Sequence, residues 1–375
     1  YNVSLNNTDE DGIMLNSGFK RTFASVRLDH KFTDKLRAGI NARYSHQRVD
    51  GVGTTSTGSQ GTNRLRNSVR YQPYSGGSDS GDLFDADYLT TGLSNPITLA
   101  NQELKYDYRN DLISSAYAQY SILKNLTFKS TVGYNRVSRH TNTFNGPVSN
   151  VGRNSAGLPA IQLDTVSQKS FINTNTLSYK PDLGKNHSLD ILVGQEINMI
   201  DIDSRSTTTK FFPIDISAED AFKSAAPANT VQDRPTSLIS GTRQFSLFSR
   251  LSYAFKNKYL ATVNFRTDAS SLFAQGKQWG YFPSAQVAWR VTEEKFVKDM
   301  DLDWLENFKV RMSYGAAGNN RIGQDLFRTL FYISSTTGGY ADRDNVVTPG
   351  LISGTATGNI LSNPNITWET NLSKN

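Results

Sequence analysis

The sequence predicts an all-β fold, namely part of a transmembrane antiparallel β-barrel with long loops at one rim and short turns at the other. Apolar and polar residues alternate along many short segments, as they do in half-buried strands. The connections between these segments alternate between short and long. The composition is polar but rich in aromatic residues: 20 Phe, 17 Tyr and 4 Trp occur among 375 residues, of which only 37 % are hydrophobic. Together these observations favour about eleven or twelve strands of such a barrel.

The strands follow from the period of two. Alternation is clearest over 36–45, 126–135, 259–266 and 308–315, where one side of each segment is apolar and the other polar. Less regular alternation predicts further strands over about 19–30, 114–122, 171–180, 188–198, 244–255 and 282–290, and 1–5 adds another. A strand of about ten residues, tilted by roughly 40°, spans ~25 Å, which is the height of the apolar band of an outer-membrane barrel.

The connections sort by length. Short turns are expected at 33–35, 124–125, 182–186 and 256–258, and long loops at about 47–111, 138–170, 201–243, 268–281 and 316–367. A soluble sandwich or propeller has no reason to sort its loops in this way, whereas a membrane barrel has short periplasmic turns and long extracellular loops. Within 292–305, acidic residues behind Thr292 and apolar residues at helical spacing predict a short helix or turn at the rim of the short turns, with an amphipathic partner-binding helix as the alternative.

Aromatic residues near the predicted strand ends fit the belts that such barrels place at the two membrane interfaces. The alternative is that they pack the core of a soluble β-protein. These residues are Tyr44, Tyr134, Tyr253, Phe255, Tyr259 and Tyr314.

The composition excludes several other classes of protein. No apolar run approaches the roughly 18–20 residues of a membrane-spanning helix. Without cysteine there is no disulfide scaffold and no thiolate metal site, and the four histidines are not spaced as metal ligands. The net charge of +6 comes without a basic cluster or a nucleic-acid-binding motif, so no nucleic acid is expected as partner.

Chemistry within the chain is sparse, so no enzyme is predicted. Glu293 and Glu294 are adjacent in sequence and fit a helix N-terminus better than a catalytic pair. The glycine-rich stretch 51–61 lacks the Lys-Ser/Thr end of a phosphate-binding loop. No cofactor is expected. The one candidate for structural Ca²⁺ is an acidic stretch whose spacing departs from the EF-hand pattern, and a solvated turn is the alternative. Its acids are Asp79, Asp82, Asp85 and Asp87.

Basic residues recur on the polar side of the predicted strands, which predicts a lumen lining that attracts anionic or polar solutes. The alternative is that each pairs with an acidic residue on a neighbouring strand and merely fills a wide, wet lumen. The residues are Arg27, Arg37, Arg43, Lys129, Arg266, Lys309 and Arg311.

Four stretches carry a more specific signal, at 266–294, 308–323, 363–370 and 12–21. Their distinctive residues are Asp268, Ser270, Ser271, Trp279, Gly280, Tyr281, Phe282, Pro283, Ser284, Tyr314, Gly315, Gly318, Asn319, Trp368 and Glu369. In this order and spacing they resemble the barrel of the SusC/RagA family of TonB-dependent outer-membrane transporters. Ala269 and Leu272 depart from the family pattern, which concerns a local turn only.

The resemblance implies a Gram-negative outer-membrane barrel of about 22 strands. It also implies an N-terminal plug that engages the TonB complex, and a SusD-like surface lipoprotein that closes over the barrel while oligosaccharides or peptides are imported. Residues 1–375 are then expected to be an interior section of the barrel, in contact with the lipid bilayer, with the plug and the C-terminal strands outside this chain. A passive porin, a receptor or adhesin barrel, and a soluble carbohydrate-binding β-protein are the alternatives.

The longest predicted loop supplies aromatic candidates for ligand binding. They are expected either to stack on sugar rings or to pack against the lid lipoprotein, and the sequence does not separate these roles. The residues are Tyr71, Tyr74, Phe84 and Tyr88.

Overall fold

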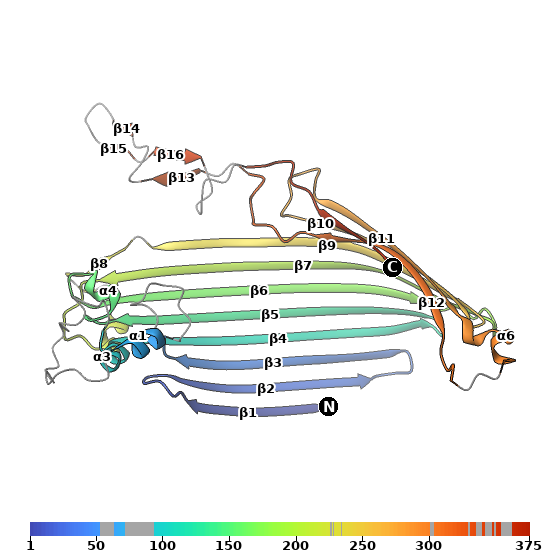
Figure 1. Ribbon diagram of the computed structural model, residues 1–375, viewed down its shortest axis with the longest axis horizontal. Helices are drawn as coiled ribbons and strands as arrows, with labels where there is room; N and C mark the ends of the chain where they lie inside the picture. The colour runs from blue at the N-terminus through green and yellow to red at the C-terminus, as the bar shows by residue number, and fades with distance from the viewer. Residues whose placement is uncertain are drawn as a thin grey trace.

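The computed structural model describes residues 1–375 except 53–63, 72–93, 226, 228, 234, 301–303, 329–330, 335–339, 342–346, 349 and 354–361. One large antiparallel sheet dominates it (Figure 1). Twelve strands follow one another in the order β1, β2, β3, β4, β5, β6, β7, β9, β10, β11, β12 and β17, and the short β8 pairs with β7. The order along the sheet is thus the order along the chain, as in an up-and-down barrel wall.

The strands of this sheet are β1 (Asn2–Asp11), β2 (Gly18–Lys31), β3 (Leu36–Asp50), β4 (Glu103–Leu123), β5 (Leu126–Asn145), β6 (Ala160–Tyr179), β7 (His187–Lys210), β8 (Val231–Gln232), β9 (Thr236–Phe255), β10 (Tyr259–Ser270), β11 (Trp279–Arg290), β12 (Lys309–Asn319) and β17 (Glu369–Lys374). Two small ribbons pair β13 (Phe331–Ser334) with β16 (Gly350–Ser353), and β14 (Tyr340–Ala341) with β15 (Val347–Thr348). The helices are α1 (Arg64–Arg70), α3 (Pro96–Gln102), α4 (Asn150–Arg153), α5 (Ala218–Lys223), the 3-10 helix η1 (Val291–Glu293) and α6 (Lys295–Lys298). None of the described helices is long and apolar enough to cross a membrane.

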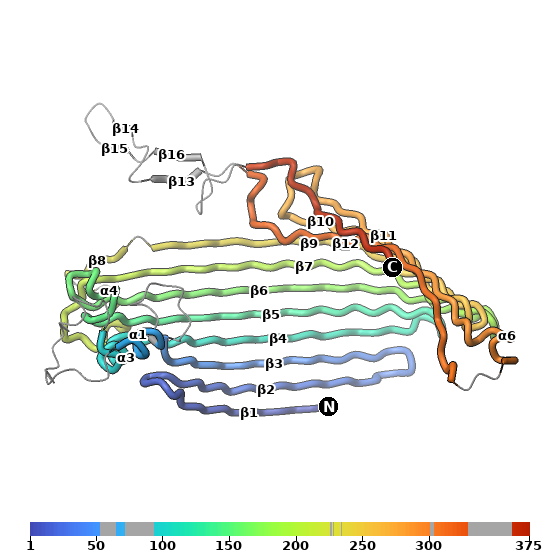
Figure 2. The backbone as a smooth tube through the Cα atoms, in the orientation of Figure 1, coloured from blue at the N-terminus to red at the C-terminus, as the bar shows by residue number. Residues whose placement is uncertain are grey.

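The chain runs back and forth between two unlike ends of the sheet (Figure 2). At the end here called the turn end, the connections are 32–35, 124–125, 180–186 and 256–258, together with the longer 291–308 that carries η1 and α6. At the opposite end, the loop end, they are 12–17, 51–102, 146–159, 211–235, 271–278 and 320–368. The predicted sorting of short turns and long loops is therefore confirmed, and the predicted helical segment lies at the turn end as η1 and α6 (Figure 1).

The strands are longer than the sequence predicted. The loops expected to begin at 47, 138 and 201 begin later, because β3 continues to Asp50, β5 to Asn145 and β7 to Lys210. The predicted loop 268–281 shrinks to 271–278, since Asp268 belongs to β10 and Tyr281 to β11. These boundaries were wrong because the hydrogen-bonded ladder outlasts the one-sided apolar pattern: where both faces of a strand lie in water, alternation disappears although pairing continues.

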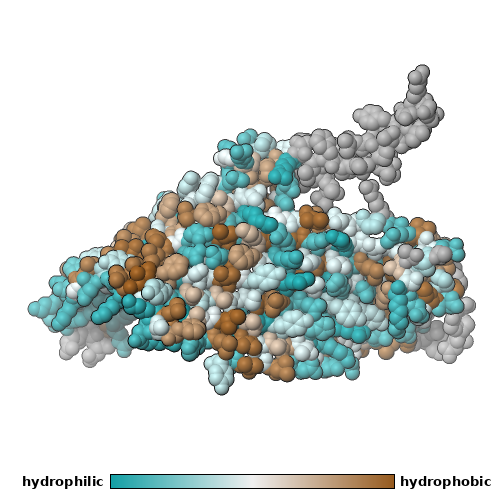
Figure 3. Space-filling view, turned by 180° about the vertical axis from the view of Figure 1, so that it is seen from behind, coloured by the Kyte–Doolittle hydropathy of each residue, from teal (hydrophilic) through white to brown (hydrophobic). Residues whose placement is uncertain are grey.

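The two faces of the sheet differ. Cross-strand partners stand on the same face, so the row Leu28, Ile40, Ala116 and Val132 crosses four strands on one side, here called the apolar face. The row Arg37, Gln119, Lys129 and Thr176 crosses on the other side, the polar face. Figure 3 shows patches of hydrophobic residues across the middle of the sheet, with mostly hydrophilic residues at the end that carries α6.

Little of the apolar surface is buried within the chain. Leu28 and Ile40 are each 45 % exposed. One buried cluster, formed by Phe144, Ile161, Phe212 and Ala221, lies at the loop end, where the connection carrying α5 packs on the strands. An apolar face of this extent without a covering layer is typical of a sheet that faces lipid or another protein.

Candidate functional site

The polar face gathers the basic residues predicted to line a lumen. Arg37, Lys129 and Arg266 stand in one cross-strand row that runs from β3 to β10 through Gln119, Thr176, Gly194 and Phe248. Arg27 and Arg43 share this face, because Arg27 lies opposite Asn41, two residues from Arg43. Arg311, opposite Ala288, and Lys309 share it as well. The parity of the sequence thus put all seven residues on a common face.

Asp29 organises the first group of these residues, which we call the Asp29 cluster. Its carboxylate accepts a hydrogen bond from Arg27 Nε at 3.2 Å and one from the Tyr117 hydroxyl, and Arg37 Nη2 lies 3.8 Å away. The Lys129 ammonium lies 5.0 Å from the centre of the Tyr117 ring, as in a cation–π contact. Strands β2, β3 and β4 therefore converge on one carboxylate, and β5 joins them through the Tyr117 ring.

Gly39 makes this convergence possible. It lies between Asp29 and Tyr117 in the cross-strand row. A Cβ atom at position 39 would stand 2.6 Å from the Tyr117 ring, 2.8 Å from Asp29 Oδ1 and 2.9 Å from the Leu28 carbonyl oxygen. A side chain here would push Tyr117 away from Asp29.

Arg266 organises a second group, the Arg266 cluster, on β7, β9 and β10. Its Nε donates to both oxygens of Asp268 at 2.9 and 3.0 Å, and Nη2 reaches Ser246 Oγ at 2.9 Å and Glu196 at 3.4 Å. The guanidinium also lies 5.7 Å from the centre of the Phe248 ring. Asp268 is only 5 % exposed, so its charge depends on this pairing.

The lining is therefore charge-paired over part of its length. Arg27, Arg37 and Arg266 have acidic partners, whereas Arg43, Lys309 and Arg311 make no ion pair with any residue that the structure describes. Sequence reasoning missed Asp29, Tyr117 and Glu196 as members of these clusters. Their signal was their place on the polar side of a strand, but their partners are set by strand register, which lies outside any local pattern.

The predicted loop residues are only partly described. Tyr71 follows α1, and its N–H donates to the Asn67 carbonyl at 2.9 Å. Tyr74, Phe84 and Tyr88 lie outside the described residues, as do the candidate calcium ligands Asp79, Asp82, Asp85 and Asp87. Among the residues that are described, no group of acids and histidines could hold a metal ion.

The residues that carried the family resemblance meet at the loop end of β10, β11, β12 and β17. Trp368 donates from its indole to the Gln278 carbonyl at 2.7 Å, and its ring centre lies 5.3 Å from those of both Phe273 and Phe282. Phe273 is 1 % exposed. Gly280 leaves room for the indole, because a Cβ there would come within 2.8 Å of it. These residues pack together as one cluster, which we call the Trp368 cluster.

Other motif residues fix the strands around this cluster. Asn319 donates to Glu369 at 2.7 Å, Ser271 Oγ accepts from the Arg243 N–H at 3.0 Å, and Ser284 Oγ accepts from Asn264 at 3.1 Å. Ser270 is buried, and Pro283 lies opposite Phe265. A Cβ at Gly315 would lie 3.2 Å from Ser284, and one at Gly318 would strike the Phe282 ring. The distinctive residues Trp279, Tyr281 and Tyr314 instead stand exposed on the apolar face.

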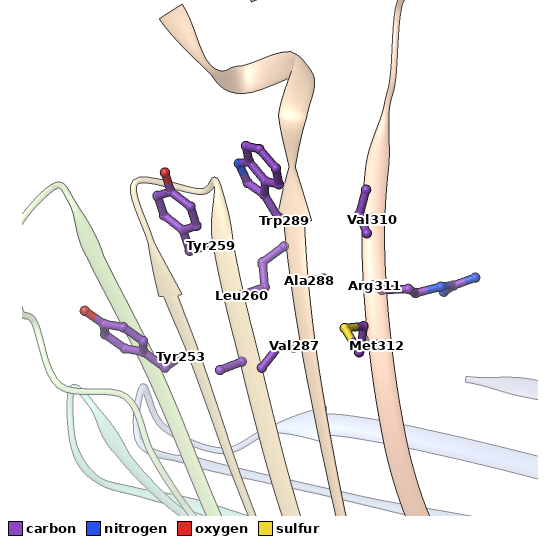
Figure 4. Close-up of a pocket in the computed structure, with 10 residues that line it drawn as sticks. Tyr253, Tyr259, Leu260, Val287, Ala288, Trp289, Val310, Arg311 and Met312 are labelled. Atoms are coloured by element: carbon purple, nitrogen blue, oxygen red, sulfur yellow. The ribbon is translucent and has the colours of Figure 1, made fainter. Parts of the chain in front are cut away.

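Aromatic residues lie toward both ends of the apolar face. Tyr44 and Tyr134 share this face near the middle of β3 and β5, and Tyr253, Phe255 and Tyr259 share it at the turn end. Trp279 and Tyr281 lie on it at the loop end of β11. At the turn end Tyr253 and Tyr259 line a shallow groove of about 420 Å³ with Trp289 and Met312 (Figure 4). In the same view Arg311 points away from these side chains. All of these aromatic side chains are at least partly exposed, which agrees with membrane-interface belts rather than a packed soluble core.

Glu294 joins this groove to the connection that carries α6. Its carboxylate accepts hydrogen bonds from the Tyr259 hydroxyl at 2.6 Å, from Lys258 Nζ at 2.9 Å and from the Trp289 indole at 3.1 Å. These three donors lower the pKa of Glu294 from 4.5 to about 2. The acid predicted to mark a helix N-terminus therefore precedes α6 and also ties three neighbouring segments together at the turn end.

Comparison with known proteins agrees with this architecture. A family model described as "TonB dependent receptor-like, beta-barrel" matches residues 53–375. TonB-dependent receptor P26 of Formosa agariphila is 29 % identical over 371 residues, which are 99 % of this chain and 35 % of that protein. TonB-dependent receptor SusC of Bacteroides thetaiotaomicron is 29 % identical over 357 residues, which are 89 % of this chain and 33 % of that protein.

The fold also matches a solved structure described as that of the RagAB peptide transporter. The TM-score is 0.78 at 20 % sequence identity, over 98 % of this chain and 39 % of that one. The present chain spans about a third of the length of the curated relatives it matches. These relatives are receptors and transporters rather than enzymes, and they are outer-membrane β-barrels of Gram-negative bacteria. The chain therefore belongs to the TonB-dependent receptor family, as barrel wall of the SusC/RagA type.

Proposed function

We propose that the protein containing this chain imports polar nutrients across the outer membrane, with energy delivered through TonB. The observation that carries the proposal is the two-sided sheet: a polar face with paired charges backs an apolar face that has aromatic residues toward both ends. In a closed barrel the polar face lines the lumen and the apolar face meets lipid. The turn end then faces the periplasm and the loop end the cell surface.

The polar face supports a solute that is polar or anionic. Arg43 and Arg311, which have no acidic partner among the described residues, offer direct contacts, and Arg27, Arg37, Lys129 and Arg266 are held in place by the Asp29 and Arg266 clusters. Oligosaccharides and peptides both fit such a lining. Tyr71, Tyr74, Phe84 and Tyr88 remain candidates for a surface contact with the solute or with a lid.

A SusD-like surface lipoprotein is proposed as the lid, and a plug outside this chain as the contact for TonB. The support is the relative named SusC and the fold shared with a structure described as that of the RagAB peptide transporter. The loop end offers a docking surface for such a lid. Exposed apolar residues lie there in the β1–β2 loop and on α1, among them Ile13, Leu65 and Val69.

Transport assays in three strains test the proposal. A strain lacking this gene, a strain lacking TonB and the parent are compared for growth on a panel of glycans and peptides as sole carbon source. We expect both deletions to abolish growth on the same substrate. Growth that needs this gene but persists without TonB would indicate a passive porin, and growth unaffected by either deletion would contradict import.

A further inference from the structure

At the loop end, strand β9 extends past the end of its neighbour β10. It pairs with β7 along its whole length, from Phe255 opposite His187 to Thr236 opposite Ser206. Its pairing with β10 ends at Gln244, opposite Ser270. The segment Thr236–Thr242, here called the open edge, therefore has a strand on one side only among the described residues, apart from contacts that Arg243 makes just below it (Figure 1).

The backbone groups of this edge point outward at alternate residues. The Arg243 carbonyl accepts from the Ser271 N–H at 2.9 Å, and the Arg243 N–H donates to Ser271 Oγ, so both face the β10 side. Successive residues of a strand direct these groups to opposite sides. The N–H and C=O groups of Gly241, Ile239 and Ser237 therefore face the same side, where β10 is no longer present.

The open edge lacks the devices that usually protect a strand edge. Such edges carry lysine, an internal proline, a bulge or a covering element. The sequence from 236 to 242 is Thr-Ser-Leu-Ile-Ser-Gly-Thr, and its register with β7 runs without a shift. The next charge along β9, on Arg243, turns the other way, because its guanidinium binds the Ile200 carbonyl at 3.0 Å and the Asp201 carboxylate at 2.6 Å. On β7, Asp203 and Arg205 stand opposite Ile239 and Ser237 and pair with each other at 3.0 Å.

Large apolar side chains flank this edge on both faces. Leu238 stands on the polar face and is 63 % exposed, and Ile239 stands on the apolar face and is 73 % exposed. The edge lies beyond Phe245, which packs edge-to-face on Trp279 in the aromatic belt near the loop end, so it stands in water above the membrane. A strand added here would find hydrogen-bond partners along its backbone and an apolar contact on either side.

We propose that the open edge captures a short peptide in extended conformation, which adds to the sheet as a strand beside β9. The inference deepens the proposed import function, because it names peptide as the cargo and this edge as its first contact. Seven residues rise by about 23 Å along a strand, which suits a peptide of about seven residues. Recognition through the main chain tolerates many sequences, as an importer of mixed peptides requires.

The edge favours a peptide over a glycan. It presents one N–H and one C=O at every second residue, a repeat of about 6.8 Å that a peptide backbone matches along its length. Glycan hydroxyls do not repeat with that alternation of donor and acceptor. Side chains of an added strand alternate between the faces, so one set meets Leu238 and the other meets Ile239.

Two matched variants test the edge in the complete protein purified in detergent. Ile239→Pro removes an N–H that faces the open side and leaves the bonds to β7, which Leu238 and Ser240 make, in place. Ile239→Ala removes the side chain only. Correct folding of both is checked by the heat-dependent shift in electrophoretic mobility of barrels. The probe is a fluorescein-labelled heptapeptide of alternating Thr and Val, together with the same peptide N-methylated at its five central residues.

We expect the heptapeptide to bind the parent protein, and Ile239→Pro to weaken it about tenfold or more, as the loss of one or two hydrogen bonds plus a steric block would. Ile239→Ala should change the affinity by no more than about threefold, and the N-methylated peptide should fail to bind.

Equal binding of the two peptides, or equal binding to Ile239→Pro and the parent, would overturn the proposal. So would a loss of bound lipoprotein lid in Ile239→Pro with peptide binding unchanged, since the edge would then hold the lid. The strain comparison in the transport assay does not involve the edge variants, so each of these outcomes would leave TonB-dependent growth that requires this gene unaffected, and the import function is tested separately.

Discussion

A few residues that tolerate no other side chain maintain the contacts between strands on the polar face. Gly39 is the clearest, because the Asp29 cluster closes over a position without a side chain. The sequence predicted the basic members of that cluster from parity alone. It gave no sign that Asp29 and Tyr117, 88 residues apart, share a hydrogen bond, since strand register decides that contact. Single residues can therefore be assigned to a face from sequence, but not to a partner.

Gly39→Ala should release Tyr117 from Asp29 and lower the free energy of unfolding by about 1–3 kcal/mol, as overpacking does. Tyr117→Phe removes the same hydrogen bond, so the double variant should lose less than the sum of the two single variants. The measurement is reversible unfolding in lipid vesicles. Gly323→Ala is the control, because its Cβ would meet Leu326 at an ordinary 3.6 Å. Strict additivity of the first pair would contradict this account.

The hydrogen bonds of Glu294 predict how the stability and the tryptophan fluorescence of the protein depend on pH. Its folded pKa of about 2 lies below the ordinary 4.5, so its contribution to stability is complete above pH 4.5 and is lost as the pH falls toward 2. Because Trp289 donates to this carboxylate, the difference in tryptophan fluorescence between the parent and Glu294→Gln should titrate near pH 2. Glu293→Gln, whose parent carboxylate pairs with Lys298, should leave that titration unchanged. A midpoint near 4.5 would show that the three hydrogen bonds do not form.

At the scale of elements, strand existence was predictable and strand length was not. The ten-residue alternation of 126–135 marks the part of β5 that lies in the membrane, but β5 continues to Asn145. Beyond the membrane its outer side is covered by protein instead of lipid, since Phe144 packs with Ile161 and Phe212. The connection that carries α5 thus stabilises the upper strands, and only the fold reveals that role.

Phe212→Ala should loosen this connection. Phe212 is fully buried, and truncation of a buried phenylalanine costs about 3–5 kcal/mol. The loss should fall on 211–225 rather than on the membrane-spanning strands, so limited proteolysis should cut this segment at least tenfold faster while the heat-dependent mobility of the barrel is retained. Ile214→Ala, at a half-exposed site in the same connection, is the control and should be cut at the parent rate.

At the scale of the whole molecule, one sequence rule carries most of the architecture. A period of two, repeated along the chain, fixes which side of every strand meets lipid and which meets water, and the sheet keeps that assignment from β1 to β12. The opposite assignment would bury Arg37, Lys129 and Arg266 in hydrocarbon. The order of strands also agrees with the general rule that consecutive strands pair, which here holds across short turns and long loops alike. The pattern does not predict where the pairing of β9 with β10 stops, so it does not predict the stretch of β9 that extends past β10.

The two faces can be distinguished by a matched pair of substitutions in β10. Val263 stands on the apolar face and is 52 % exposed, and its neighbour Asn264 stands on the polar face. Val263→Arg places a guanidinium in lipid and should lower the free energy of unfolding in vesicles by about 2–4 kcal/mol near the midplane. Asn264→Arg places the same group in a watery lumen and should cost less than about 1 kcal/mol. Equal costs for the two variants in vesicles would mean that the apolar face is not the face that meets lipid.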